Sequence, residues 1–181
     1  LEMRPDDPQA LFAYSLAATG LGQPERADQP SARLLALQPQ VDEAVLLRAQ
    51  VLLQTGQAAT AAPLLGAFLR SHPRHTQARV TLARVLLEGK DYAAARREFE
   101  TVLRFEPDNA DARLAAALLA GQMGDRRGAR SQLLKLAADS KQADQANYYL
   151  GKLAEDGADG REAIARYARV QGGEHRADAL L

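Results

Sequence analysis

Apolar residues recur along the chain with the spacing of amphipathic helices. Positions three, four and seven apart share one face of a helix, because a helix completes a turn every 3.6 residues. This spacing is clearest on either side of residue 89, with one apolar face formed by Leu82, Leu86 and Leu87 and another by Phe99, Val102 and Leu103. The pattern therefore predicts two consecutive helices that each bury one face.

The same pattern returns every 34 residues. Prolines 39, 73 and 107 keep this period, and Pro5 fits it as well. Small and large apolar positions follow the same register, as shown by Ala27, Ala61, Ala95, Ala129 and Ala163, by Leu65, Phe99, Leu133 and Tyr167, and by Leu34, Phe68, Val102, Leu136 and Val170. The period defines five units, at 8–41, 42–75, 76–109, 110–143 and 144–177, and predicts a single solenoid over residues 1–181.

Residues 1–7 fit the end of a preceding unit, and residues 178–181 fit the start of a following one. The chain also begins with Leu1 rather than Met. We therefore expect that it was excised from a longer protein.

Each unit is predicted to form two antiparallel helices. Gly22, Gly56 and Gly124 share a mid-unit position, and Gly89 and Gly157 fall one residue earlier. A glycine there is expected to end the first helix in a left-handed conformation, which glycine adopts at little cost. An Asp after it, as in Asp91 and Asp125, is expected to cap the second helix, and the repeated alanines are expected where two helices cross closely.

Three departures from the repeat predict local irregularities. Lys141 replaces the expected proline, so a longer or looser connection is expected around 139–145. Pro30 lies within the expected second helix of the first unit and predicts a shifted or kinked helix, or a local hinge. Pro63 is expected in the first turn of a second helix, where proline is tolerated.

The composition agrees with an all-α fold. The chain contains 37 Ala and 28 Leu but only 14 Val, Ile and Thr residues, which disfavours a sheet protein. The formal net charge is zero, which argues against a nucleic-acid partner. No apolar stretch reaches the length of about 20 residues that a membrane span requires, so no direct membrane insertion is expected.

Catalytic and metal-binding chemistry is not indicated. The chain has no Cys and no glycine-rich phosphate loop, so no thiolate site or nucleotide cofactor is expected. His72 and His75 flank a turn proline, with no carboxylate at a defined helical spacing, and His175 lies in another expected turn. Surface positions are the default interpretation of all three, and acidic pairs such as Asp6-Asp7 are interpreted as helix starts. We therefore predict that the chain is not an enzyme and holds no metal or cofactor.

These residues resemble the tetratricopeptide repeat family over essentially the whole chain. The fifth unit is the most similar to the family pattern, with Tyr148-Tyr149-Leu150-Gly151 in its first helix and Ala163, Tyr167 and Val170 in its second. The resemblance implies a right-handed superhelical solenoid whose first helices line a concave groove. Such a protein binds a protein or peptide partner.

The resemblance also implies which residues would line this groove. The family's fifth positions correspond to Phe12, Leu46, Val80, Leu114 and Tyr148, and its ninth positions to Leu16, Gln50, Arg84, Leu118 and Lys152. The fifth positions are all apolar, which suits a helix or an extended apolar peptide. The alternative is that these residues pack against neighbouring repeats or are covered by another part of the intact protein. No ninth position is Asn, so the family's clamp for a peptide carboxylate is absent.

A more specific role is implied by residues 148–173, which look like proteobacterial outer-membrane tetratricopeptide lipoproteins. One member of that group is an adaptor for a periplasmic carboxyl-terminal processing protease. This predicts a periplasmic location, with an anchor in the outer membrane, whereas without that likeness the location would be cytoplasmic. The alternatives are a scaffold in envelope assembly or exopolysaccharide export, and the repeat region of a larger enzyme such as a glycosyltransferase. The oligomeric state stays open.

Overall fold

The computed structural model describes residues 6–179, and this part of the chain is helical without any strand. The all-α prediction is confirmed. The predictions for residues 1–5 and 180–181 lie outside the described residues. The helices are α1 Pro8–Gly20, α2 Pro24–Leu37, α3 Asp42–Gln54, α4 Ala58–Ser71, α5 Thr76–Glu88, α6 Tyr92–Phe105, α7 Ala110–Gln122, α8 Arg126–Ala137, α9 Ala143–Glu155, α10 Gly160–Tyr167 and α11 Arg176–Ala179.

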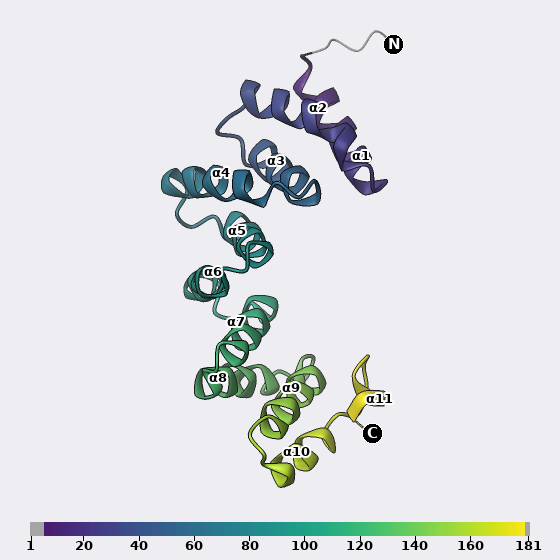
Figure 1. Cartoon of the computed structure of the whole chain (residues 1–181), viewed down its shortest axis with the longest axis vertical. Helices are drawn as coiled ribbons and strands as arrows, with labels where there is room; N and C mark the ends of the chain where they lie inside the picture. Colours follow the sequence, from purple (N-terminus) through teal and green to yellow (C-terminus); the bar gives the residue numbers. More distant parts are fainter. Residues whose placement is uncertain (1–5, 180–181) are drawn as a thin grey trace. The chain divides into compact units, whose positions relative to one another are not determined.

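The helices form two compact bodies, residues 1–98 and residues 99–181. From here on these two are called the first and the second unit, and each 34-residue period is called a repeat. Within the first unit, α1 to α5 pack consecutively, and the first helices α1, α3 and α5 also contact one another in order. Within the second unit, α7 to α10 pack consecutively. Figure 1 shows these helix pairs joined by short turns, which confirms the predicted helix–turn–helix packing in each unit.

The repeated alanines are buried as predicted. Ala27 and Ala61 are fully buried, and Ala129 and Ala163 are almost so. A small side chain lets two helices approach closely, so larger residues beside it can fill the remaining core. In the first unit this core joins Val45, Leu52 and Leu65, among others.

The turn within each pair contains a left-handed residue at one fixed repeat position. Glycine occupies it at Gly22, Gly56 and Gly124, with φ of 70°, 74° and 80°. In the third and fifth repeats the residue is instead Lys90 (φ 59°) or Ala158 (φ 58°). The prediction that Gly89 and Gly157 take this conformation was therefore wrong: the fold fixes the position of the left-handed residue, and these glycines lie one residue before it.

The predicted aspartate caps are confirmed. Asp91 accepts a hydrogen bond from the Ala94 N–H at 3.0 Å, and Asp125 accepts one from Gly128 at 2.8 Å. Asp7 likewise caps α1 through the N–H of Gln9. Each cap satisfies a backbone donor that the helix itself leaves unpaired.

The prolines and the fourth connection depart in part from expectation. Helix α2 starts at Pro24 and continues through Pro30, so it is not shifted past this proline. Pro63 is the sixth residue of α4 rather than part of its first turn, because α4 already begins at Ala58. The connection 138–142 is one residue longer than the connections 38–41, 72–75 and 106–109, which confirms the expected longer link near Lys141.

Helix α10 ends earlier than the repeat predicts. Val170 was expected within the second helix of the fifth repeat, but α10 ends at Tyr167. Val170 is nevertheless buried, outside any helix. The Asp144 carboxylate accepts hydrogen bonds from the N–H groups of Gln171 and Gly172, at 3.0 and 2.8 Å. These bonds replace helical ones, so the chain leaves the helical path before Val170.

Candidate partner-binding surface

The ten predicted groove residues fall into two classes of exposure. All five fifth positions (Phe12, Leu46, Val80, Leu114 and Tyr148) are half-buried, and all five ninth positions (Leu16, Gln50, Arg84, Leu118 and Lys152) are exposed. Together these ten residues are called the first-helix face below. Six of them lie in the first unit and four in the second. Their arrangement as one concave groove stays a prediction.

The fifth positions also serve the core. Phe12 packs against the buried cluster around Leu34 and Val51, Leu46 packs against that around Val45 and Leu52, and Leu114 packs against that around Leu133. Packing against neighbouring helices was the alternative interpretation of these residues, and it accounts for their buried side.

The ninth positions supply the exposed anchors. Leu16 is 50% exposed and Leu118 is 39% exposed, and both are large apolar side chains without full cover. Gln50, Arg84 and Lys152 add polar groups at the equivalent positions. The first-helix face therefore combines single exposed leucines with polar side chains.

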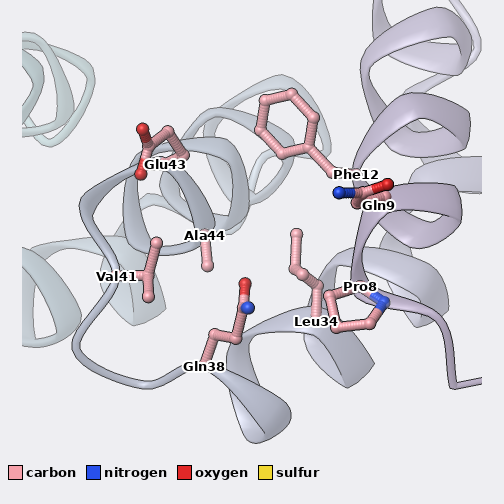
Figure 2. A pocket seen from close by; sticks show the side chains of 8 residues that line it. All are labelled: Pro8, Gln9, Phe12, Leu34, Gln38, Val41, Glu43 and Ala44. Atoms are coloured by element: carbon pink, nitrogen blue, oxygen red, sulfur yellow. The ribbon is translucent and has the colours of Figure 1, made fainter.

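A pocket opens beside Phe12 in the first unit. It has a volume of about 260 Å³ and lies between α1, the end of α2 and the start of α3, lined by Pro8, Gln9, Phe12, Leu34, Gln38, Val41, Glu43 and Ala44. Figure 2 shows the Phe12 ring at its edge and the Leu34 side chain and Gln38 amide pointing into it. These eight residues are called the N-terminal pocket. Its lining is mainly apolar, with polar groups from two glutamines and one carboxylate.

A smaller pocket lies on the first-helix face in the second unit. Its volume is about 130 Å³, and it is bordered by α7, α8 and α9. The ninth-position residues Leu118 and Lys152 both line it, together with Tyr149 and Asp156. Two predicted groove residues thus share a concavity in the second unit, whereas in the first unit Phe12 alone of the ten lines the N-terminal pocket.

Tyr148 is covered by the chain itself. The His175 ring stacks on it with centroids 4.2 Å apart and an interplanar angle of 3°. Tyr149 contacts both rings edge-on, and the Lys152 ammonium lies 5.9 Å from the Tyr148 centroid. His175 was expected to be a surface turn residue, but its side chain is only 18% exposed because it packs into this aromatic cluster.

Tyr167 packs against α9, with its ring centroid 6.0 Å from that of Tyr148. Its hydroxyl donates to Glu155 at 2.7 Å, and burial together with this hydrogen bond raises the pKa of Tyr167. The ring lies against Gly151, where an added Cβ would approach it to 2.3 Å. The Gly in the Tyr-Tyr-Leu-Gly motif is therefore required for this close helix contact.

His75 has a carboxylate partner that the sequence spacing did not reveal. Its Nε2 lies 3.2 Å from the Asp42 carboxylate, and its Nδ1 accepts the N–H of Ala78 and so caps α5. Hydrogen bonding with Glu43 and with His75 lowers the pKa of Asp42 to about 2. The two residues are 33 apart in sequence, so only the tertiary fold brings them together.

Metal-binding clusters and membrane spans are not found in the described part of the chain. No group of three or more His, Cys, Asp or Glu side chains is placed to hold a metal ion in residues 6–179. Across the same range, none of the helices has the length and apolar character of a membrane span.

Comparison with known proteins gives a family match over part of the chain and a shared fold over nearly all of it. Residues 52–119 match the model of the tetratricopeptide repeat family. No curated protein sequence matches the chain significantly. Among solved structures, MamA 41-end from Desulfovibrio magneticus RS-1 is similar with a TM-score of 0.80 and 18% identity, over 94% of this chain and 95% of that one.

Two further structures share the fold. A thermophilic TPR protein from Thermus thermophilus has a TM-score of 0.67 and 21% identity, over 96% of this chain and 99% of that one. The human IFIT1 dimer with PPP-AAAA has a TM-score of 0.75 and 17% identity, over 97% of this chain and 45% of that one. Residues 52–119 thus match the tetratricopeptide repeat family, and the fold that these solved structures share with this chain extends over nearly all of it.

Proposed function

We propose that the chain is a non-catalytic interaction scaffold that binds a partner protein or peptide through the first-helix face. The observation that carries this proposal is the regular exposure of that face. Each fifth position anchors the helix in the core, and each ninth position projects a side chain outward. A rigid array of repeats can present such side chains with little entropic cost on binding.

The apolar anchors are the centre of the proposed surface. Buried apolar side chains surrounded by weaker contacts dominate the energy of most protein interfaces. Leu16 and Leu118 are large and exposed, so a partner can bury both, and Leu118 also lines a pocket.

The test compares two leucines of the second unit that are equally exposed. Leu118 on α7 is 39% exposed, and Leu134 on α8 is 40% exposed. Leu118→Asp places a charge on the first-helix face, whereas Leu134→Asp places it on a second helix. Proteins cross-linked to the wild-type chain in a bacterial envelope extract should be lost with Leu118→Asp and retained with Leu134→Asp. Equal retention by both variants, with unchanged circular dichroism, would move the binding surface elsewhere.

An adaptor role for a periplasmic processing protease is the more specific form of this proposal. It is supported by the sequence likeness of residues 148–173 to outer-membrane lipoproteins of that type. Its test is the identity of the captured proteins. The role requires that a processing protease or its substrates are among the proteins whose capture is lost with Leu118→Asp.

A further inference from the structure

Phe12 and Tyr148 occupy the same position of the repeat but differ in what covers them. Each is the fifth residue of its repeat, on α1 and on α9. Phe12 borders the open N-terminal pocket, whereas the His175 ring lies flat on Tyr148 at 4.2 Å. One aromatic ring therefore faces an open space, and its equivalent carries a second ring.

The early end of α10 explains this difference. Helix α2 ends at Leu37, and the 34-residue register places the equivalent residue at Gly173, well beyond the end of α10 at Tyr167. The segment after α10 is held by the Asp144 carboxylate, which bonds the N–H groups of Gln171 and Gly172. The chain thereby folds back and delivers His175 onto Tyr148.

The surroundings of the two rings also correspond. Val170 stands at the register position of Leu34, and both are buried. Glu174 stands at the register position of Gln38, and its carboxylate oxygen lies 3.3 Å from the His175 Nε2, although the two do not form a hydrogen bond. In the N-terminal pocket the Gln38 amide points into the space that Phe12 borders (Figure 2). In the fifth repeat the His175 ring thus occupies the place beside Tyr148 that stays open beside Phe12 in the first repeat.

We infer that the N-terminal pocket binds a nitrogen-bearing aromatic side chain of a partner peptide, a Trp or His ring stacked on Phe12 as His175 stacks on Tyr148. The inference rests on the proposed function and adds the chemistry of the partner to it. The volume of about 260 Å³ is below the range of about 300–1,000 Å³ typical of whole small-molecule ligands, and it suits a single side chain.

The polar groups of the pocket select the type of ring. The Gln38 amide oxygen and the Glu43 carboxylate are acceptors in a mainly apolar lining, to which Gln9 adds a second amide. A ring N–H can donate to such an acceptor, whereas an aliphatic side chain has no donor to offer it. A flat ring also gains offset or stacked contact with Phe12 beyond its burial.

The experiment uses N-acetyltryptophanamide as the probe and N-acetylleucinamide as its aliphatic control. Methyl NMR of the whole chain would follow Leu34, Val41 and Ala44, which line the pocket. The tryptophan probe should shift these methyl signals saturably, and the leucine probe should bind about 2- to 10-fold more weakly. Equal binding of the two probes, or no saturable shift with either, would overturn the inference.

Phe12→Leu tests the stacking itself. This variant keeps an apolar side chain in the core but removes the ring, so binding of the tryptophan probe should fall about 2- to 10-fold while that of the leucine probe is unchanged. Unchanged methyl signals from Leu133 and Val170, in the second unit, would show that the rest of the chain is intact. The capture test of the proposed function depends on Leu118, whereas the probe test depends on the N-terminal pocket. Capture that is lost with Leu118→Asp, but without binding of the tryptophan probe, would refute only this inference. Binding of the tryptophan probe without such capture would refute only the proposed function.

Discussion

Arg79 and Glu98 form an ion pair that joins α5 to α6, with Arg79 Nη1 2.7 Å from Glu98 Oε2. The same guanidinium donates from Nε and Nη2 to the Pro73 carbonyl, so it also closes the turn before α5. One repeat later, Arg113 makes the equivalent contacts with Gln132 and Pro107. In the preceding repeat, by contrast, the same two positions are the apolar Val45 and Leu64, which pack in one core. The fold therefore accepts either a polar or an apolar pair here.

Replacing one partner of this pair should cost more than replacing both. Glu98→Leu leaves the partly buried Arg79 Nη1 without its acceptor and should destabilise the chain by about 1–2 kcal/mol. Arg79→Val combined with Glu98→Leu copies Val45 and Leu64 and should recover most of that loss. Urea unfolding of the two single variants and the double variant measures the coupling. If the stability losses of the two single variants simply add in the double variant, the two side chains are not coupled.

Lys90 and Ala158 adopt a left-handed conformation without being glycines, so substitution by glycine should relieve backbone strain. A side chain in this conformation costs about 1–2 kcal/mol, because its Cβ crowds the carbonyl oxygen. Lys90→Gly and Ala158→Gly should therefore each raise the free energy of unfolding by up to about 1 kcal/mol, after the entropic cost of glycine in the unfolded chain. Gly56→Ala is the reverse control and should lower it by a similar amount. If neither glycine variant is more stable than the wild type, the left-handed φ of 58–59° at these two residues is contradicted.

The 34-residue period made the helix pairs, the buried alanines and the aspartate caps predictable, because each depends on neighbours close in sequence. The end of α10 was not predictable in this way, since Asp144 lies 27 residues from Gln171. The stacking of His175 on Tyr148 follows from that same distant contact. The left-handed Lys90 and Ala158 align with Gly22 in the register, although residue type alone points to the glycine before each. The ten groove residues came from the family resemblance, and their exposure pattern is a property of the folded chain.

Protonation of the Asp42 carboxylate should make the chain less stable in acid. Its pKa is lowered to about 2 in the fold by hydrogen bonding with Glu43 and with His75, against an ordinary value of 3.8. A carboxyl of this kind stabilises the fold above its unfolded pKa, and the contribution disappears as the pH falls from about 4 to about 2. Because the side chain is 48% exposed, the contribution is less than about 1 kcal/mol.

The measurement is the urea midpoint of Asp42→Asn near pH 6 and near pH 2. The variant should be less stable than the wild type at the higher pH and equal to it at the lower one. Asp108→Asn, at an exposed turn position, is the matched control and should leave the pH dependence unchanged. An Asp42→Asn variant with the full acid sensitivity of the wild type would exclude this carboxylate as its source.

Gly151 should not tolerate a side chain. An added Cβ would meet the Tyr167 ring at 2.3 Å, so Gly151→Ala must displace that ring and its hydrogen bond to Glu155. We expect a loss of about 1–3 kcal/mol. Gly121→Ala is the control, because the nearest atom to its Cβ is 3.8 Å away and alanine favours the helix. Thermal unfolding should therefore separate the two variants in opposite directions, and a shared direction would refute the contact.

The most direct test of the central claim is site-specific photo-cross-linking at four leucine positions. A benzoylphenylalanine would replace Leu16 or Leu118 on the first-helix face, or Leu37 or Leu134 on the second helices, all of them exposed. Binding through the first-helix face predicts that the partner is cross-linked from positions 16 and 118 and not from positions 37 and 134. Cross-links from positions 37 and 134 alone would contradict it.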